Sequence, residues 1–180
     1  ITDDAFLLVL CHEIGHLIGG APTIKPQNTT SSEGQADYFS TAKCFKKVAK
    51  NYPTTIPPKA NIHPVAMELC KKQFNSKQEQ TICLRSSIAQ EALARAYSIL
   101  SESDFIPQFD TPDPIERALI LFNGYPSIQC RLDTIFSGSL CKKSEDLLLS
   151  FEKYNQGVCS KPNGDSLGIR PACWYVPRVD

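Results

Sequence analysis

The sequence has no excess of either charge and no long apolar run. Its 180 residues carry 19 lysines and arginines against 19 aspartates and glutamates, so the formal net charge is zero. Nucleic acids and anionic membranes are bound through a basic excess, so we expect neither as the main partner. No apolar run approaches the roughly 20 residues that a membrane-spanning helix needs. The remaining composition, 42% hydrophobic and 21% charged, is ordinary for a globular domain.

The cysteine spacings typical of thiolate metal sites and redox motifs are also missing, although cysteine is abundant. The chain has eight cysteines, an even number, and none of them form a Cys-x-x-Cys pair. Disulfides are therefore the better interpretation, and they favour an extracytoplasmic location, either periplasmic or secreted. We expect most or all of these cysteines to be paired.

Eight cysteines allow 105 connectivities, and spacing alone does not choose between them. Proximity along the chain suggests the pairs Cys70–Cys83, Cys130–Cys141 and Cys159–Cys173, which leaves Cys11–Cys44. The alternative for Cys11, which lies in an apolar stretch, is a small buried thiol.

Alternating apolar and polar runs are few, and no internal repeat is visible, so we expect a mainly α fold. Apolar periodicity and turn residues predict helices at 3–19, 32–50, 64–72, 86–101, 115–122, 126–137 and 143–153. Residues 1–156 are expected to form one helical domain, on which the Cys-containing tail 157–180 packs through Trp174 and Tyr175. A Pro- and Thr-rich loop is expected at 52–58, and the lysines near the end of the second helix are expected to form a solvated face.

Histidine is scarce, yet two of the three histidines fall in the short run His12-Glu13-Ile14-Gly15-His16. Positions four apart lie on one face of a helix, so His12 and His16 point the same way. Two imidazoles so placed can hold one zinc ion, and Glu13 beside them is a candidate general base for a zinc-bound water. The remaining histidine, His63, is interpreted as a loop or cap residue.

A catalytic zinc usually has three protein ligands, and Glu33 is the best third ligand in the sequence. Ser32 and Gln35 have the spacing of a capping box, which predicts that a helix begins here. Asp37 then lies one turn after Glu33, where it is well placed to accept a hydrogen bond from the free ring nitrogen of a ligand histidine. The alternatives are a glutamate that interacts with the helix dipole and a solvated aspartate.

His-Glu-x-Gly-His followed by Glu-x-x-Ala-Asp resembles the gluzincin metallopeptidases. The pattern is most similar to the family of CAAX prenyl endopeptidases and of periplasmic and mitochondrial quality-control proteases. The third marker of that family is His-Pro-Ser with an arginine six residues after the histidine, and this chain has Tyr125-Pro126-Ser127 and Arg131. These motifs cover about a fifth of the chain. Tyrosine replaces histidine, but both side chains can donate a hydrogen bond to a developing oxyanion.

The resemblance implies a helical gluzincin-like core that binds one Zn²⁺ through His12, His16 and Glu33 and hydrolyses peptide bonds in a peptide or protein substrate. Tyr125 and Arg131 would assist catalysis, or Arg131 would instead pair with Asp37. Family members carry sheet strands and a helix upstream of the His-Glu helix. These are missing here, so we expect the chain to be a fragment, either a processed mature form or one piece of a longer polypeptide whose N-terminal part is a partner.

Two other functions remain open. The chain could be a catalytically inactive zinc-binding interaction module, braced by disulfides, that retains a metallopeptidase scaffold. It could also be a structural secreted domain without metal. Glu13 argues for the enzyme, because a binding module has no need of a base.

Overall fold

A computed structural model describes residues 2–25, 29–52, 56 and 60–177. Residues 26–28, most of the predicted loop at 52–58 and the last three residues of the tail lie outside this part of the chain. The fold is mainly α, and the described residues contain no strand, only the isolated bridges Thr23–Ser31 and Cys159–Ile169. None of the described helices is both long and apolar enough to cross a membrane.

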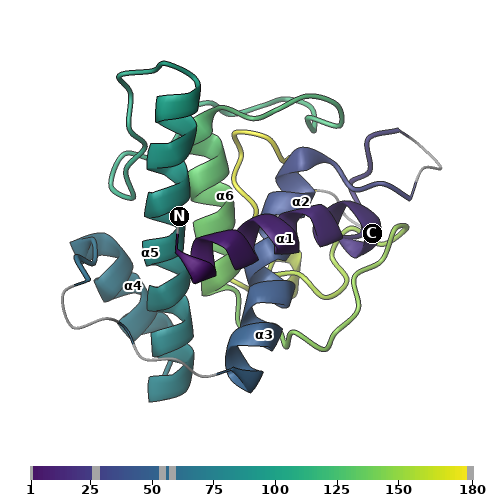
Figure 1. Ribbon diagram of the computed structural model, residues 1–180. Helices are drawn as coiled ribbons and strands as arrows, with labels where there is room; N and C mark the ends of the chain where they lie inside the picture. The colour runs from purple at the N-terminus through teal and green to yellow at the C-terminus, as the bar shows by residue number, and fades with distance from the viewer. Residues whose placement is uncertain (1, 26–28, 53–55, 57–59, 178–180) are drawn as a thin grey trace.

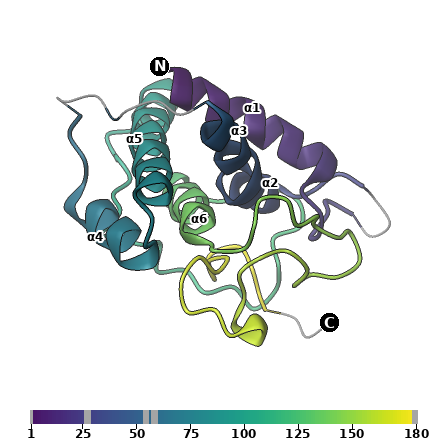
Figure 2. The same cartoon turned by 90° about the horizontal axis from the view of Figure 1, so that it is seen from below.

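The helices pack around one another without a sheet. Their bounds are α1 Asp3–Ile18, α2 Glu33–Phe39, the π-helical segment η1 Ser40–Phe45, α3 Lys46–Asn51, α4 Pro64–Gln73, α5 Lys77–Leu100 and α6 Ile128–Leu140. Helix α1 contacts α2, η1 and α5, while α6 contacts α2, η1 and α5 from another side (Figure 1). The coil that follows α6 gathers along one side of the helices (Figure 2).

The first helix forms where its capping residues predict. The hydroxyl of Thr2 accepts a hydrogen bond from the backbone N–H of Ala5, and Asp3 and Asp4 occupy the first turn, where acidic groups favour the helix dipole. The predicted helix at 3–19 is thus confirmed to within one residue. Helices α4, α5 and α6 also confirm predictions, but α5 begins nine residues earlier than the predicted 86.

Helices α1 and α2 approach each other closely at Gly15. A side-chain carbon placed on Gly15 would lie 2.9 Å from both the Cα and the carbonyl oxygen of Ala36. Real side-chain carbons do not come this near to backbone atoms, so only glycine permits this spacing. Because Gly15 lies between the two motif histidines and Ala36 between the two motif acids, this contact brings the two halves of the motif together.

The second predicted helix is continuous, but its middle part is π-helical rather than α-helical. Residues 33–51 run through α2, η1 and α3, and the π-helical segment was not foreseen. The predicted solvated lysine face is wrong for two of its members, because Lys43 is only 4% exposed and Lys46 only 9% exposed. Their ammonium groups donate hydrogen bonds to the carbonyl oxygens of Ser144 and Cys141. The lysines therefore hold the segment after α6 against this helix.

All eight cysteines are paired. The bridges Cys11–Cys44 and Cys70–Cys83 confirm two predictions, and the first excludes a free buried thiol at Cys11. The other two predicted pairs are wrong, because the observed bridges are Cys130–Cys173 and Cys141–Cys159. The tail folds back so that Trp174 is fully buried, which brings the adjacent Cys173 to α6 rather than to its neighbour in sequence.

Two predicted helices do not form. Residues 115–122 run as coil, and the backbone N–H groups of Arg117 and Leu121 donate to the tail carbonyls of Ala172 and Trp174. The Leu121 donor is one that a helix at 115–122 would need for its own hydrogen bond. Residues 143–153 also run as coil, and the backbone carbonyls of Ser144 and Ser150 accept hydrogen bonds from the Lys43 ammonium and from the Ala21 N–H. Here Glu145 accepts from Lys50 at 2.6 Å.

Candidate metal centre

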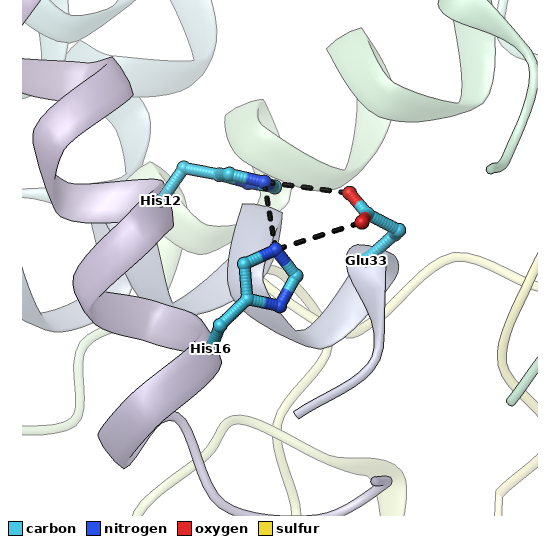
Figure 3. Close-up of side chains that lie close together, drawn as sticks. All are labelled: His12, His16 and Glu33. Carbon is cyan, nitrogen blue, oxygen red and sulfur yellow. Dashed lines mark hydrogen bonds and ion pairs between the residues drawn. The ribbon is translucent and has the colours of Figure 1, made fainter. Parts of the chain in front are cut away.

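Three side chains from α1 and α2 converge on one point. The Nε2 atoms of His12 and His16 lie 3.2 Å apart. The carboxylate oxygens of Glu33 lie 3.4 Å from His12 Nε2 and 3.5 Å from His16 Nε2. Figure 3 shows the two rings and the carboxylate pointing toward one another across the space between the helices. The structure therefore brings together the three residues predicted as ligands.

These separations fit a tetrahedral metal ion. Ligand atoms bound about 2.0–2.1 Å from a tetrahedral centre lie roughly 3.3–3.4 Å from one another. The two histidine nitrogens lie 3.2 Å apart, and each lies 3.4 or 3.5 Å from one of the two Glu33 oxygens. Glu33 Oε2 is also buried and has no hydrogen-bond partner among the residues that the structure describes. A buried carboxylate oxygen without a donor is costly, and a cation at this point would satisfy it. Two imidazole nitrogens and one carboxylate form a donor set typical of zinc.

Both histidines are oriented through their other ring nitrogen. His16 Nδ1 lies 2.9 Å from the carbonyl oxygen of Ser31. This oxygen accepts a hydrogen bond from Nδ1–H, which leaves Nε2 directed at the site. His12 Nδ1 lies 2.8 Å from Asp37 Oδ1, close enough for an ion pair, although the N–H does not point squarely at the oxygen. The expected contact between Asp37 and a candidate ligand histidine is thus present. The carbonyl of Ser31 was not predicted, because a backbone acceptor has no sequence signature.

Asp37 is also held by Arg131. The guanidinium donates two hydrogen bonds to the carboxylate, from Nε to Oδ2 and from Nη2 to Oδ1, each 2.8 Å long. Asp37 is only 1% exposed, so both charges are largely removed from water. Of the two roles considered for Arg131, the geometry matches pairing with Asp37. The same Nη2 lies 4.0 Å from Glu33 Oε2, which adds positive potential beside that candidate ligand.

The electrostatics of the centre favour anionic carboxylates. Burial tends to raise the pKa of Asp37, but the charge of Arg131 and the contact with His12 lower it overall. Burial likewise opposes ionisation of Glu33, and His12 outweighs it, so that this pKa is also lowered. Burial would lower the pKa of His12, yet Asp37 and Glu33 together raise it to about 9. The negative charges of Asp37 and Glu33 therefore favour either a proton on His12 or a metal cation at this point.

A cleft of ≈ 280 Å³ opens onto the three converging residues. Glu13 is exposed and lines it, on the same helix as the two histidines. Tyr125 also lines the cleft, with its ring centre 6.0 Å from the guanidinium carbon of Arg131 and 74% of its surface exposed. The structure thus places every predicted site residue at one cleft.

Tyr97 is a cleft residue that the sequence interpretation missed. It lies on α5, lines the cleft and places its ring 5.2 Å from the guanidinium carbon of Arg131. The arginine thus has aromatic rings from two separate segments near its guanidinium, an arrangement that favours a fixed cation. Tyr97 lies in a periodic helix with no motif around it, so only tertiary packing identifies it.

The predicted capping box is half confirmed. Ser32 is the residue before α2, as predicted, but its hydroxyl makes no capping hydrogen bond. The Gln35 side chain does not reach back to Ser32. It donates to the carbonyl of Gly19 at 2.7 Å and accepts from Arg170 at 3.0 Å. Gln35 therefore links the end of α1 to the tail, and α2 is held by these tertiary contacts.

No protein-family model, no curated protein and no solved structure matches this chain.

Proposed function

We propose that this protein is a zinc-dependent peptidase with a helical gluzincin-like core. The observation that carries the proposal is the convergence of His12, His16 and Glu33 at separations of 3.2–3.5 Å, the spacing of tetrahedral zinc ligands. One Zn²⁺ per chain would supply a Lewis acid and lower the pKa of a nearby water toward about 7. Metal analysis of unstripped protein should find about one zinc per chain, and protein that neither contains nor takes up zinc would refute the site.

The residues around the centre have separate roles in the proposed hydrolysis. The Glu13 carboxylate takes the proton from the attacking water and later delivers it to the leaving amine. The Tyr125 hydroxyl donates a hydrogen bond to the substrate carbonyl oxygen as it gains negative charge. Arg131 acts through Asp37, which in turn orients the ring of His12. The exposed position of Glu13 and Tyr125 at the cleft supports their contact with a peptide substrate.

Glu13→Gln separates catalysis from metal binding. We expect the variant to retain zinc, because Glu13 is not among the converging ligands, and to lose roughly 10²–10⁴-fold in peptide hydrolysis. The assay is cleavage of an unstructured protein substrate with and without a chelator. Glu68→Gln, the same substitution at an exposed position on α4, is the matched control and should cleave like the unaltered protein.

The same assay distinguishes the peptidase from the inactive zinc-binding module and from the metal-free structural domain. Chelator-sensitive cleavage that disappears in Glu13→Gln supports the peptidase. Zinc uptake without cleavage supports the inactive zinc-binding module. Absence of both supports the metal-free structural domain. Unchanged cleavage in Glu13→Gln would remove Glu13 from the mechanism.

Four disulfides suggest an oxidising environment, and we propose that the protein acts in the periplasm or outside the cell. Thiol counting on denatured, freshly isolated protein should find none of the eight cysteines free. Six or more free thiols would contradict both the pairing and the location.

We also propose that further polypeptide covers the outer face of α1. That face is apolar where a surface helix is normally polar, with exposed fractions of 42–69% at Phe6, Leu10, Ile14, Leu17 and Ile18. Upstream strands of the kind that the motif resemblance implies would bury such a stripe. A longer form of the protein should then protect the amides of α1 from hydrogen exchange more strongly than these 180 residues do.

A further inference from the structure

A second cavity, whose charged side chains are mostly lysines, lies apart from the metal cleft. It has a volume of ≈ 190 Å³, lies between α3, the start of α5 and the segment after α6, and shares no lining residue with the metal cleft. Its charged lining consists of Lys46, Lys50, Lys142, Lys143, Glu79 and Glu145. Four lysines against two glutamates leave two net positive charges when all six groups are ionised. We call this the lysine cavity.

Lys46 is a buried cation to which no carboxylate in the described part of the chain is hydrogen-bonded. It is 9% exposed, donates to the carbonyl oxygen of Cys141 and lies 5.5 Å from the ring centre of Phe74. An ammonium has three donors, and a carbonyl with an aromatic face supplies less negative charge than the full anion that buried cations ordinarily need. Burial and, to a lesser extent, repulsion from Lys43 lower its pKa to about 8, although Glu145 and Glu79 act in the opposite direction.

The two lining acids already have partners. Glu145 accepts a hydrogen bond from Lys50 at 2.6 Å, and Glu79 accepts one from the Ser76 hydroxyl at 2.7 Å. At the outer side, Lys142 is exposed and Lys143 lies 3.6 Å from Asp165. The lysine ammonium groups of the cavity therefore have hydrogen-bond donors that its two glutamate carboxylates do not accept.

We propose that the lysine cavity binds a small oxyanion of the phosphate class. Lys46 would hold it from the buried side, and Lys142 and Lys143 from the exposed side. Phosphate oxygens accept several hydrogen bonds at once, and charge-assisted hydrogen bonds of this kind are the strong ones. Such an anion also gives Lys46 a hydrogen-bonded counter-charge, which the nearby carboxylates of Glu145 and Glu79 do not supply because they are bonded to Lys50 and Ser76. Free phosphate, a phosphorylated side chain and a phospholipid headgroup share this chemistry.

The test is a titration of the zinc-loaded protein with inorganic phosphate, followed by amide chemical shifts at constant ionic strength. We expect saturable shifts at residues of the lysine cavity, with a Kd on the order of 1 mM. Lys142→Gln should weaken binding about two- to fivefold, as expected for a partly solvated charge. Lys46→Met should weaken it about tenfold or more, because it removes a buried charged donor. Lys153→Gln, an exposed lysine outside the cavity, is the matched control and should bind like the unaltered protein.

Three results would overturn the proposal: shifts that grow linearly without saturation, shifts confined to residues of the metal cleft, or equal weakening by Lys153→Gln. If Lys46→Met does not fold, the double variant Lys142→Gln/Lys143→Gln decides, and unchanged binding there refutes the site. Parallel titrations with glycerol phosphate and with a phosphoserine peptide distinguish the sources. Tighter binding of either than of inorganic phosphate identifies a headgroup or a modified protein as the ligand.

Discussion

Replacing Asp37 by asparagine tests how the candidate metal centre is held in place. The carboxylate is 1% exposed, receives two 2.8 Å hydrogen bonds from Arg131 and lies 2.8 Å from His12 Nδ1. Asparagine keeps the shape of the side chain but removes the charge. It also turns one oxygen into an NH₂ group, whose protons would face the donors of Arg131 or His12. The substitution therefore leaves a largely buried guanidinium without its hydrogen-bonded counter-ion, with only the Glu33 carboxylate 4.0 Å away.

The expected loss follows from that geometry. Breaking a buried ion pair by removing one partner costs about 3–5 kcal/mol, which for a domain of this size lowers the melting temperature by roughly 6–20 °C. Zinc affinity should fall about 10–100-fold, because His12 loses the group that orients it. The folded-state pKa of Asp37 is lowered from its ordinary 3.8, so its stabilisation is complete well above that value and is lost as pH falls through the folded-state pKa. The two proteins should therefore differ most near neutral pH and converge in acid.

Thermal unfolding and competition with a chromophoric zinc chelator measure both effects. Asp146→Asn, which removes a carboxylate from an exposed pair with Lys47, is the matched control and should melt like the unaltered protein. The double variant Asp37→Asn/Arg131→Met should recover part of the lost stability, since it also removes the uncompensated cation. If Asp37→Asn melts and binds zinc like the unaltered protein, Asp37 neither neutralises Arg131 nor orients His12.

Three further predictions concern the same region. Removing the Cys11–Cys44 bridge, which spans 33 residues and joins α1 to η1, should cost about 4 kcal/mol and weaken zinc binding; an unchanged thermal melt would contradict its bracing role. Metal-free protein should lose stability as pH rises from 6.5 through about 9, because folded His12 keeps a proton that the unfolded chain releases. Denaturant unfolding at several pH values measures this, and His12→Gln should flatten the slope. Tyr125→Phe should lower kcat about 10²-fold with little change in KM, and an unaltered kcat would exclude the hydroxyl from catalysis.

Local patterns predicted the candidate centre better than they predicted the surrounding chain. His12 and His16 lie on one helical face whatever packs against them, so their spacing alone places both rings together. The helix of Glu33 begins at Ser32 as its residues indicate, although the hydroxyl of Ser32 makes no capping bond. In contrast, residues 115–122 carry helical periodicity yet form coil, and the tail accepts hydrogen bonds from the backbone N–H groups of Arg117 and Leu121.

The sequence by itself determined a mainly α fold, the pairing of the cysteines as a class and the position of His12 and His16 on one helical face. These depend on periodicity, on residue chemistry and on contacts within one turn of helix, whereas the other residues of the centre were expected from the motif resemblance. Only the tertiary structure decided that Cys130 pairs with Cys173, that Lys46 is buried and that Arg131, with the rings of Tyr97 and Tyr125 near it, binds Asp37. Each of these joins segments far apart in the chain. Such contacts depend on how whole elements pack, and several arrangements satisfy the same local pattern until the folded chain selects one.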